Sequence, residues 1–221
     1  MLKKLIVTSD GSHSISIPEL NVTYHSIHGA IQESMHVFIR AGFQSVRPLQ
    51  AAKRILEIGF GTGLNALLTL IEAEKSNHKI FYETIEPFPV SEEEVHQLNY
   101  CEILNRSDMR PVFEKLHSCE WEKEINIGEN FVLKKYSTKL QNHKTLKLQN
   151  LIYFDAFGPK AQPELWTKEI FDKMFSMLVP GGILVTYSSK GEVRRAMQAA
   201  GFVVEKIPGP PGKREITRAK K

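Results

Sequence analysis

The residues best suited to ligand chemistry lie in a glycine turn and at the end of an apolar run. Glu57 precedes Gly59-Phe-Gly-Thr-Gly63, in which glycines occupy alternate positions. Without Cβ atoms, these glycines let the backbone turn sharply and lie against a ligand. The apolar run from Lys79 ends in Glu86, whose carboxylate can accept hydrogen bonds from both hydroxyls of a ribose. Together they predict a site for a ligand that contains a ribose.

The spacing of the glycines narrows the choice of ligand. The helix expected after Gly63 offers unpaired N–H groups and a positive dipole end. The dinucleotide fingerprint would place its third glycine one residue later, and no Lys-Ser or Lys-Thr follows, which excludes a Walker-type phosphate site. The pattern resembles the S-adenosyl-L-methionine (SAM) site of class I methyltransferases, where the turn faces the methionine portion. A glycine turn inside an ordinary βα unit is the alternative.

A second chemical stretch is Leu151-Ile-Tyr-Phe-Asp-Ala-Phe-Gly-Pro-Lys160, an apolar run that ends in Asp155. In an open α/β sheet, ligands sit beyond the carboxyl ends of the strands, near the point where the strand order reverses. If this run and the run before Gly59 are neighbouring strands, Asp155 faces the same cleft as the glycine turn. The alternative is that Asp155 caps a turn.

The elements that must position these residues follow from apolar periodicity. Strands are expected near 53–58, 79–86, 131–136, 150–155 and 182–188, and helices near 63–75, 167–178 and 190–200. Pro180-Gly-Gly182 should end the helix before it and start the next strand, and 202–207 with 214–217 should form a final antiparallel hairpin. Residues 87–130 read as a mostly helical insertion. The expected fold is therefore α/β and Rossmann-like, with a mostly parallel seven-stranded sheet.

An N-terminal extension over residues 1–45 precedes the main domain over 46–221. Leu5–Thr8 and Ser14–Ile17 flank an Asp-Gly turn and predict a β-hairpin. A loop with Tyr24 and His25 follows, and then a helix from Ala30 to Ala41 with apolar residues on one face. We expect this extension to cap the cofactor cleft.

Composition bounds the class of protein. The chain has 221 residues, with apolar and charged fractions of a soluble globular protein, and no apolar run is long enough to span a bilayer or to form a signal peptide. Cys101 and Cys119 lack metal-ligand spacing, so we expect no metal site and a reducing cytoplasm. The net charge of +4 resides in residues 202–221, and a second basic stretch covers 134–147. Such surfaces suit a phosphate backbone, although solvated faces explain them equally well.

A series of motifs carries a more specific resemblance. From about Tyr24 to the C-terminus the chain resembles the methyltransferase half of the bacterial tRNA wobble-uridine enzymes of the MnmC family, and their stand-alone, MnmD-like forms. The shared segments are Glu57-Ile-Gly-Phe-Gly-Thr-Gly-Leu-Asn65, Glu86-Pro-Phe-Pro-Val90, Asp155-Ala-Phe-Gly-Pro159, Trp166, Pro180-Gly-Gly182, Val193-Arg-Arg195, Ala200-Gly-Phe202 and Gly212-Lys-Arg-Glu215. The Asp-x-Phe-x-Pro segment with its downstream Trp is more distinctive than the glycines.

The resemblance implies SAM-dependent methylation of 5-aminomethyl-2-thiouridine in the tRNA anticodon stem-loop. Asp155 would orient the amine and accept its proton, and Phe157 would pack on the flipped-out uracil ring. The implied cofactor-binding residues are Glu57, Gly59, Phe60, Gly61, Thr62, Gly63, Asn65 and Glu86. The implied substrate and tRNA contacts are Tyr24, His25, Pro159, Lys160, Lys213 and Arg214. Because the chain ends after this half, we expect no FAD chemistry and an amine supplied by another enzyme.

Two departures and three rival functions stay open. Tyr136-Ser-Thr-Lys139 stands where the family often has an acidic residue near the adenine, and Asp-Ala-Phe-Gly-Pro replaces the family's Asp-Gly-Phe-Ala-Pro. The rivals are a SAM enzyme acting on a small amine or a protein, a nicotinamide-dependent oxidoreductase, and an RNA-binding module without catalysis. Product formation without tRNA, titration of NAD against SAM, and SAM binding itself distinguish them.

Overall fold

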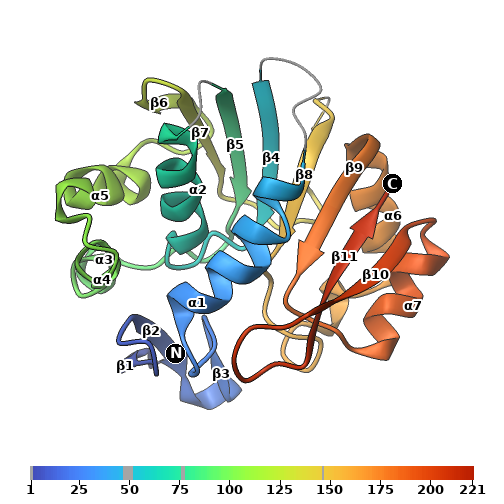
Figure 1. Cartoon of the computed structure of the whole chain (residues 1–221), viewed down its shortest axis with the longest axis horizontal. Coiled ribbons are helices and arrows are strands. Elements are labelled where there is room, and N and C mark those ends of the chain that lie inside the picture. The colour runs from blue at the N-terminus through green and yellow to red at the C-terminus, as the bar shows by residue number, and fades with distance from the viewer. Residues whose placement is uncertain (1, 47–51, 76–77, 146) are drawn as a thin grey trace.

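The computed structural model describes residues 2–46, 52–75, 78–145 and 147–221. Within these residues one central sheet dominates the molecule (Figure 1). Its strands are β4 (Ala52–Ile58), β5 (Lys79–Ile85), β6 (Glu124–Gly128), β7 (Phe131–Tyr136), β8 (Gln149–Phe154), β9 (Leu178–Thr186), β10 (Val203–Pro208) and β11 (Glu215–Lys220). Their order is β10-β11-β9-β8-β4-β5-β7-β6. The strand order therefore reverses at β4, which lies between β5 and β8.

The pairing confirms a mostly parallel sheet. β4 pairs in parallel with β5 and β8, and the parallel order extends outward to β7 and β9. The terminal hairpin is antiparallel, with β11 between β9 and β10. The expectation of seven strands was wrong, because the described residues form eight. The extra strand, β6, pairs antiparallel with β7 at the far edge.

Helices cover both faces of the sheet, which makes a three-layer molecule (Figure 1). The α-helices are α1 (Ala30–Ser34), α2 (Leu64–Glu74), α3 (Glu92–His96), α4 (Tyr100–Ile103), α5 (Arg110–Ser118), α6 (Lys168–Met177) and α7 (Gly191–Ala199). A π-helical segment, Met35–Arg40, continues α1, and short 3₁₀ turns cover Pro18–Leu20, Phe43–Ser45, Ser107–Met109 and Pro163–Leu165. α1 and α2 pack on one face, and α6 and α7 on the other.

The two apolar cores follow from the two-residue period of a strand. In β8, Leu151 and Tyr153 join the core beneath α1 and α2. Ile152 and Phe154 point the opposite way and join the core beneath α6 and α7. Burial on both faces explains why the last four residues of this strand, Leu151 to Phe154, are all apolar.

Three local expectations need correction. Residues 87–130 are helical through α3, α4 and α5 but also contain β6, which the helical reading missed. Pro180-Gly-Gly182 does not precede a strand; it lies inside β9, which begins at Leu178 directly after α6. The helix expected over Ala30–Ala41 is α-helical only to Ser34 and π-helical beyond it.

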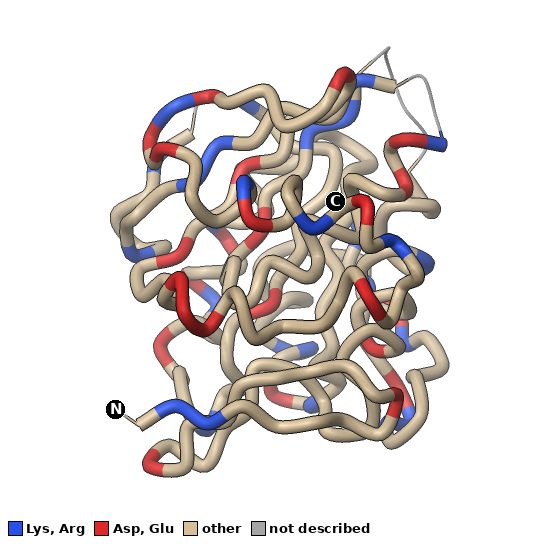
Figure 2. Tube along the Cα trace, turned by 90° about the vertical axis from the view of Figure 1, so that its left-hand side faces the viewer, with Lys and Arg blue, Asp and Glu red and all other residues tan. Residues whose placement is uncertain are grey.

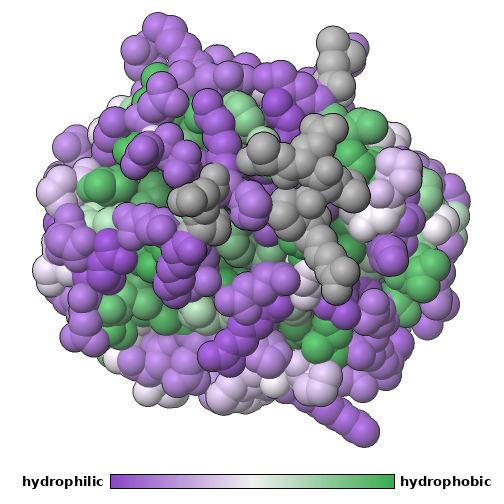
Figure 3. Space-filling model, turned by 45° about the horizontal axis from the view of Figure 1, so that its top comes forward, coloured by the Kyte–Doolittle hydropathy of each residue, from purple (hydrophilic) through white to green (hydrophobic). Residues whose placement is uncertain are grey.

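The N-terminal sheet lies at the edge where the parallel strands of the central sheet end (Figure 1). It has a third strand beyond the expected hairpin: β1 (Lys4–Val7), β2 (His13–Ile17) and β3 (Val22–Thr23). The backbone N–H of His13 donates to Asn99 Oδ1 at 2.8 Å, and Lys3 pairs with Glu94 at 2.9 Å. The extension is therefore fastened to the 87–130 segment. At the opposite edge of the central sheet, mainly hydrophilic side chains are seen (Figure 3).

Candidate active site

The glycine turn joins β4 to α2, and each of its glycines has a positive φ. A Cβ on Gly59 would lie 2.7 Å from the carbonyl oxygen of Asp155, and one on Gly61 would lie 3.0 Å from the ring of Tyr24. A Cβ on Gly63 would lie 2.6 Å from Nε2 of His117. Close neighbours and backbone conformation therefore both require glycine at these positions.

A cavity of about 240 Å³ opens beside this turn. Glu86, at the end of β5, lies in its wall, and its carboxylate accepts the backbone N–H groups of Gly61 (3.0 Å) and Phe88 (2.8 Å). A carboxylate has about four lone-pair positions, so two remain for a ligand. The cavity is lined by Tyr24, His25, Ile58, Gly59, Phe60, Gly61, Thr62, Ile85, Glu86, Pro87, Phe88, Lys139, Leu140, Gln141, Asp155, Ala156, Phe157, Gln162, Glu164 and Leu165.

Asp155 begins a turn at the carboxyl end of β8, next to the glycine turn. Its backbone N–H donates to the carbonyl of Ile58 at 2.9 Å, which continues the parallel pairing of β4 and β8. Asp155 and Glu86 thus lie on one cavity, as expected from the order of the strands.

Three side chains hold the turn that follows Asp155. The indole N–H of Trp166 donates to the carbonyl of Phe157 at 2.8 Å, and the backbone N–H of Phe157 donates to Gln162 Oε1 at 2.9 Å. The hydroxyl of Tyr187 donates to the carbonyl of Ala156 at 2.9 Å. Trp166 therefore accompanies the Asp-x-Phe-x-Pro segment because it fixes the backbone of that segment.

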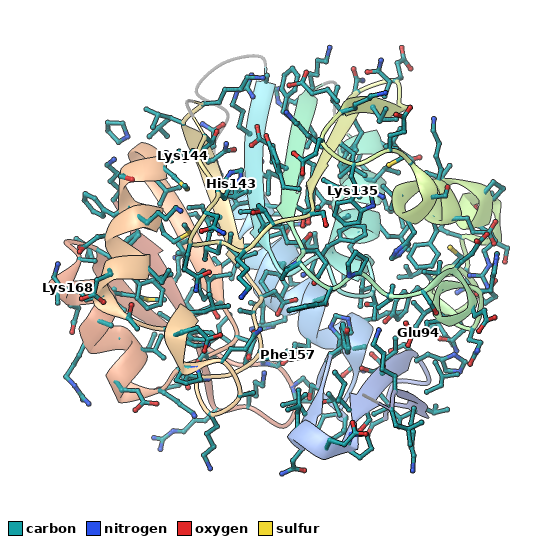
Figure 4. All side chains as sticks on the ribbon, turned by 180° about the vertical axis from the view of Figure 1, so that it is seen from behind. Glu94, Lys135, His143, Lys144, Phe157 and Lys168 are labelled. Atoms are coloured by element: carbon teal, nitrogen blue, oxygen red, sulfur yellow. The ribbon has the colours of Figure 1, made fainter. Side chains whose placement is uncertain are left out.

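A second cavity of about 380 Å³ lies on the other side of the same turn. It shares Tyr24, His25, Asp155, Ala156 and Phe157 with the first. The rings of Tyr24 and Phe157 meet edge to face, with centroids 5.1 Å apart. Phe157 lies between the central sheet and the N-terminal sheet (Figure 4). The Tyr24–Phe157 pair thus stands where the two cavities adjoin.

Two carboxyl groups beneath the turn share one amide. Asn65 Nδ2 donates to Glu57 Oε1 at 3.1 Å and to Asp155 Oδ2 at 2.8 Å. Burial raises the pKa of Glu57 to about 8. Burial, followed by the negative charges of Glu33 and Glu57, raises the pKa of Asp155 well above its ordinary value. Asp155 therefore holds a proton more strongly than an exposed aspartate does.

His25 holds the glycine turn and is uncharged. Its Nε2 lies 2.7 Å from Thr62 Oγ1, which also accepts the hydroxyl of Tyr100 at 3.0 Å. Burial lowers the pKa of His25 to about 4. His117 approaches the same turn from α5, with Nε2 3.1 Å from the carbonyl of Thr62. The 87–130 segment therefore helps to shape the glycine turn.

The expected basic contacts fall into two groups. Arg214 and Lys160 are exposed, and Pro159, which precedes Lys160 in sequence, is half-buried. Lys213 turns into the second cavity, where its ammonium pairs with Glu33 and lies 4.2 Å from the centre of the Tyr187 ring.

The basic stretch at 134–147 is not one exposed surface. Lys135 is buried, and its ammonium donates to the carbonyl of His117. Lys147 pairs with Glu124 at 2.7 Å. Basic and acidic residues are interspersed along the chain trace in Figure 2.

Comparison with known proteins agrees with this geometry. Residues 112–221 match the family described as S-adenosyl-L-methionine-dependent methyltransferase. The crystal structure of MnmC2 from Aquifex aeolicus is 26% identical and superposes with a TM-score of 0.77, covering 99% of this chain and 70% of that one.

The chain is a SAM-dependent methyltransferase. It is 28% identical to the "tRNA 5-methylaminomethyl-2-thiouridine biosynthesis bifunctional protein MnmC" of Burkholderia mallei over 230 residues, or 96% of this chain and 34% of that protein. The MnmC of Methylobacillus flagellatus is 29% identical over 209 residues, or 87% of this chain and 31% of that protein. The methyltransferase thus spans about a third of the length of these curated relatives.

The first cavity fits the cofactor of this methyltransferase. Gly59, Gly61 and the carboxylate of Glu86 face one space, as a ligand with a flexible amino-acid end and a ribose requires. Phe60 and Thr62 line it too, whereas Glu57, Gly63 and Asn65 lie behind the wall and support it. Lys139, from the stretch that lacks the family's acidic residue, also lines this cavity. The cavity sizes lie near the range of about 300–1,000 Å³ usual for small-molecule sites.

Sequence reasoning missed Glu33, Gln162 and Tyr187. Tyr187 follows β9, so the argument from strand ends that selected Asp155 would have found it. Glu33 gave no such signal, because the burial of its neighbours Ala30, Ile31 and Ser34 is seen only in the structure.

The described residues contain neither a cluster of metal ligands nor a membrane-spanning helix. Across residues 2–46, 52–75, 78–145 and 147–221, no three His, Cys, Asp or Glu side chains gather as metal ligands. In the same ranges, no helix has the length and apolarity needed to cross a membrane.

Proposed function

We propose that this methyltransferase N-methylates 5-aminomethyl-2-thiouridine at the wobble position of tRNA, giving 5-methylaminomethyl-2-thiouridine. The observation that carries the proposal is a pair of adjoining cavities with Asp155 in the wall of both. The first cavity suits a cofactor and the second an acceptor, and we call them the cofactor cavity and the acceptor cavity. The reacting groups would meet at Asp155, which lines both. The names of the MnmC relatives supply the identity of the base.

The acceptor amine must lose a proton for this reaction. When bound, SAM supplies a methyl group that passes to the amine nitrogen, while the electron pair of the broken C–S bond stays on sulfur. A primary alkylamine resembles lysine, with a pKa near 10.4. When Asp155 is ionised, its raised pKa makes the carboxylate a stronger base than that of an exposed aspartate, so proton transfer from the amine is less uphill. Asp155 orients the nitrogen and accepts its proton, directly or through water.

The base itself would lie against aromatic rings. Tyr24 and Phe157 face the second cavity, and the backbone of Phe157 is held by Trp166 and Gln162. Stacking on aromatic side chains is how proteins commonly hold unstacked RNA bases. A rigid aromatic wall next to Asp155 fixes the direction in which the C5 substituent points. Such alignment supplies much of the rate enhancement of an in-line displacement.

The RNA backbone would cross the exposed basic residues. Arg214 and Lys160 lie in the loops that carry Lys213 and Phe157 into the acceptor cavity. Phosphate contacts of this kind orient RNA without reading its sequence. The anticodon stem-loop is the expected partner.

The test is incubation of the protein with methyl-labelled SAM and tRNA from cells that lack this activity, followed by nucleoside analysis. The expected product is labelled 5-methylaminomethyl-2-thiouridine. Parallel reactions without tRNA and with Asp155→Asn are the controls. Label in a different nucleoside, or in a product formed without tRNA, would overturn the proposal in favour of another acceptor.

A further inference from the structure

The acceptor cavity contains an ion pair, with a buried carboxylate and a partly buried ammonium, that methyl transfer itself does not use. Glu33 comes from α1, and its side chain is only 8% exposed. Its Oε1 pairs with the ammonium of Lys213, which comes from the loop between β10 and β11. Its Oε2 accepts the backbone N–H of Ser26 at 2.9 Å. Both charged groups line the cavity, together with Asp155.

The position of Lys213 is set by its neighbours. Gly212 has a φ of +83°, and a Cβ on it would collide with the imidazole of His28. The ammonium of Lys213 then lies over the ring of Tyr187. Figure 1 shows the β10–β11 loop reaching toward the N-terminal elements, far from Lys213 in sequence. Since buried ion pairs can often be replaced by apolar residues without loss of stability, the fold alone does not explain this pair.

We propose that Glu33 and Lys213 read the base-pairing edge of a uracil-type base in the acceptor cavity. This inference rests on the proposed function. Uracil presents an N3–H donor beside its O4 acceptor, and the C5 substituent that carries the amine adjoins O4. A carboxylate next to an ammonium is the complementary pair, with Glu33 accepting N3–H and Lys213 donating to O4. The amine then points toward Asp155, which lines the same cavity.

The pair also rejects cytosine. Cytosine reverses both positions, with an unprotonated N3 facing Glu33 and an amino group facing Lys213. An acceptor would then face an acceptor at Glu33, and a donor would face a donor at Lys213. Buried polar groups without a partner cost free energy. A site built to hydrogen-bond one pattern discriminates strongly against its reverse.

The experiment compares two anticodon stem-loop oligoribonucleotides that carry 5-aminomethyluridine or 5-aminomethylcytidine at the same position. We expect the wild-type protein to prefer the uridine in kcat/KM by at least ~10-fold. In Glu33→Gln the amide can donate to N3 of cytosine, so the preference should shrink to within about three-fold. Lys213→Met should lower kcat/KM for the uridine by about 10-fold, mainly through KM. Since both oligonucleotides use the same Asp155, their ratio is insensitive to changes in its basicity.

Matched controls separate recognition from folding. Glu120→Gln, shortly before β6, and Lys75→Met, at the end of α2 and the opposite edge of the sheet, alter exposed charged side chains outside both cavities. They should leave the ratio unchanged. SAM binding and thermal unfolding report whether each variant folds. Equal methylation of both bases by the wild type, or an equal loss on both in Glu33→Gln, overturns the inference.

A failure of the proposed function gives a different result. If neither oligonucleotide is methylated, their equilibrium binding in the presence of S-adenosylhomocysteine still decides the inference. A uridine preference that Glu33→Gln removes supports it, and equal binding of both bases overturns it.

Discussion

The two cavities differ in how the chain builds them. The cofactor cavity is shaped in large part by backbone, because Gly59 and Gly61 line it and two backbone N–H groups hold the carboxylate of Glu86 in its wall. The acceptor cavity is shaped by side chains from distant segments, among them Glu33, Tyr187 and Lys213. A local sequence motif encodes the glycine wall of the first, whereas the second exists only after the N-terminal elements and the last hairpin close over the sheet.

This difference predicts which property a substitution in each cavity should change. Changes in the glycine turn should affect cofactor binding and stability together, because they move the backbone. Changes in the acceptor cavity should alter substrate choice and leave the cofactor in place. Four predictions test this contrast.

Asp155→Asn tests the wall between the cavities and should have the largest effect. The amide oxygen can still accept the hydrogen bond from Asn65, but the side chain can no longer take a proton. Loss of a general base typically costs about 10²–10⁴-fold in rate. We expect that loss in kcat with SAM affinity within about three-fold of wild type. Kinetics with isothermal titration of SAM measure both, and an equal loss of SAM binding would make the role of Asp155 structural.

Gly59→Ala tests the backbone side of the comparison. The backbone of the new alanine must keep a φ of +92°, and its Cβ would lie 2.7 Å from the carbonyl oxygen of Asp155. We expect SAM binding to weaken by at least ~10-fold, or about 1.4 kcal/mol, together with a lower Tm. Gly181→Ala is the matched control, since its φ is +77° but its Cβ meets no described atom within 4 Å. That variant should show backbone strain of about 1–2 kcal/mol and normal SAM binding.

Glu57→Gln tests the buried carboxyl group that shares the amide of Asn65 with Asp155. A carboxyl group whose pKa rises on folding stabilises the folded state most below its unfolded pKa of 4.5, and that contribution is lost as pH rises to about 8. The glutamine carries no such proton. The stability of wild type relative to Glu57→Gln should therefore fall between these pH values, by up to ~1.4 kcal/mol per pH unit. Denaturant unfolding across this range measures the difference.

The control for that series is Glu192→Gln, on the exposed surface of α7. Its stability curve should run parallel to that of the wild type. Parallel curves for Glu57→Gln as well would show that Glu57 is ionised in the folded protein.

Arg214→Gln should have the smallest effect. Arg214 lies exposed beside the acceptor cavity, where we expect one phosphate contact. Loss of a contact to single-stranded RNA should reduce the slope of log affinity against log salt by about 0.7. Methylation of bound substrate should keep its rate at saturation. Binding titrations at several salt concentrations measure this, with Lys75→Gln as a control at the opposite edge; an unchanged slope would remove Arg214 from the interface.

Much of the cofactor side was predictable because its signals are local. Glycines at alternate positions, and carboxylates at the ends of apolar runs, predicted one shared cavity for Glu86 and Asp155, and the structure confirms it. Tyr24 and His25 were expected at the substrate, as the resemblance implies, and they line both cavities. β6 was missed because Glu124–Gly128 is short, polar on alternate residues and paired only at the sheet edge.

Three features could be inferred from local sequence: the parallel α/β order, the turn that needs glycine, and the carboxyl groups that directly follow β5 and β8. These features follow from residue type and from periods of two and 3.6 residues, which act over a few neighbours. Tertiary structure decided that Lys213 turns inward to Glu33, 180 residues away. It also decided that His25 holds Thr62 as an uncharged side chain. Burial and charge at a site depend on every segment packed around it, and no local pattern encodes that environment.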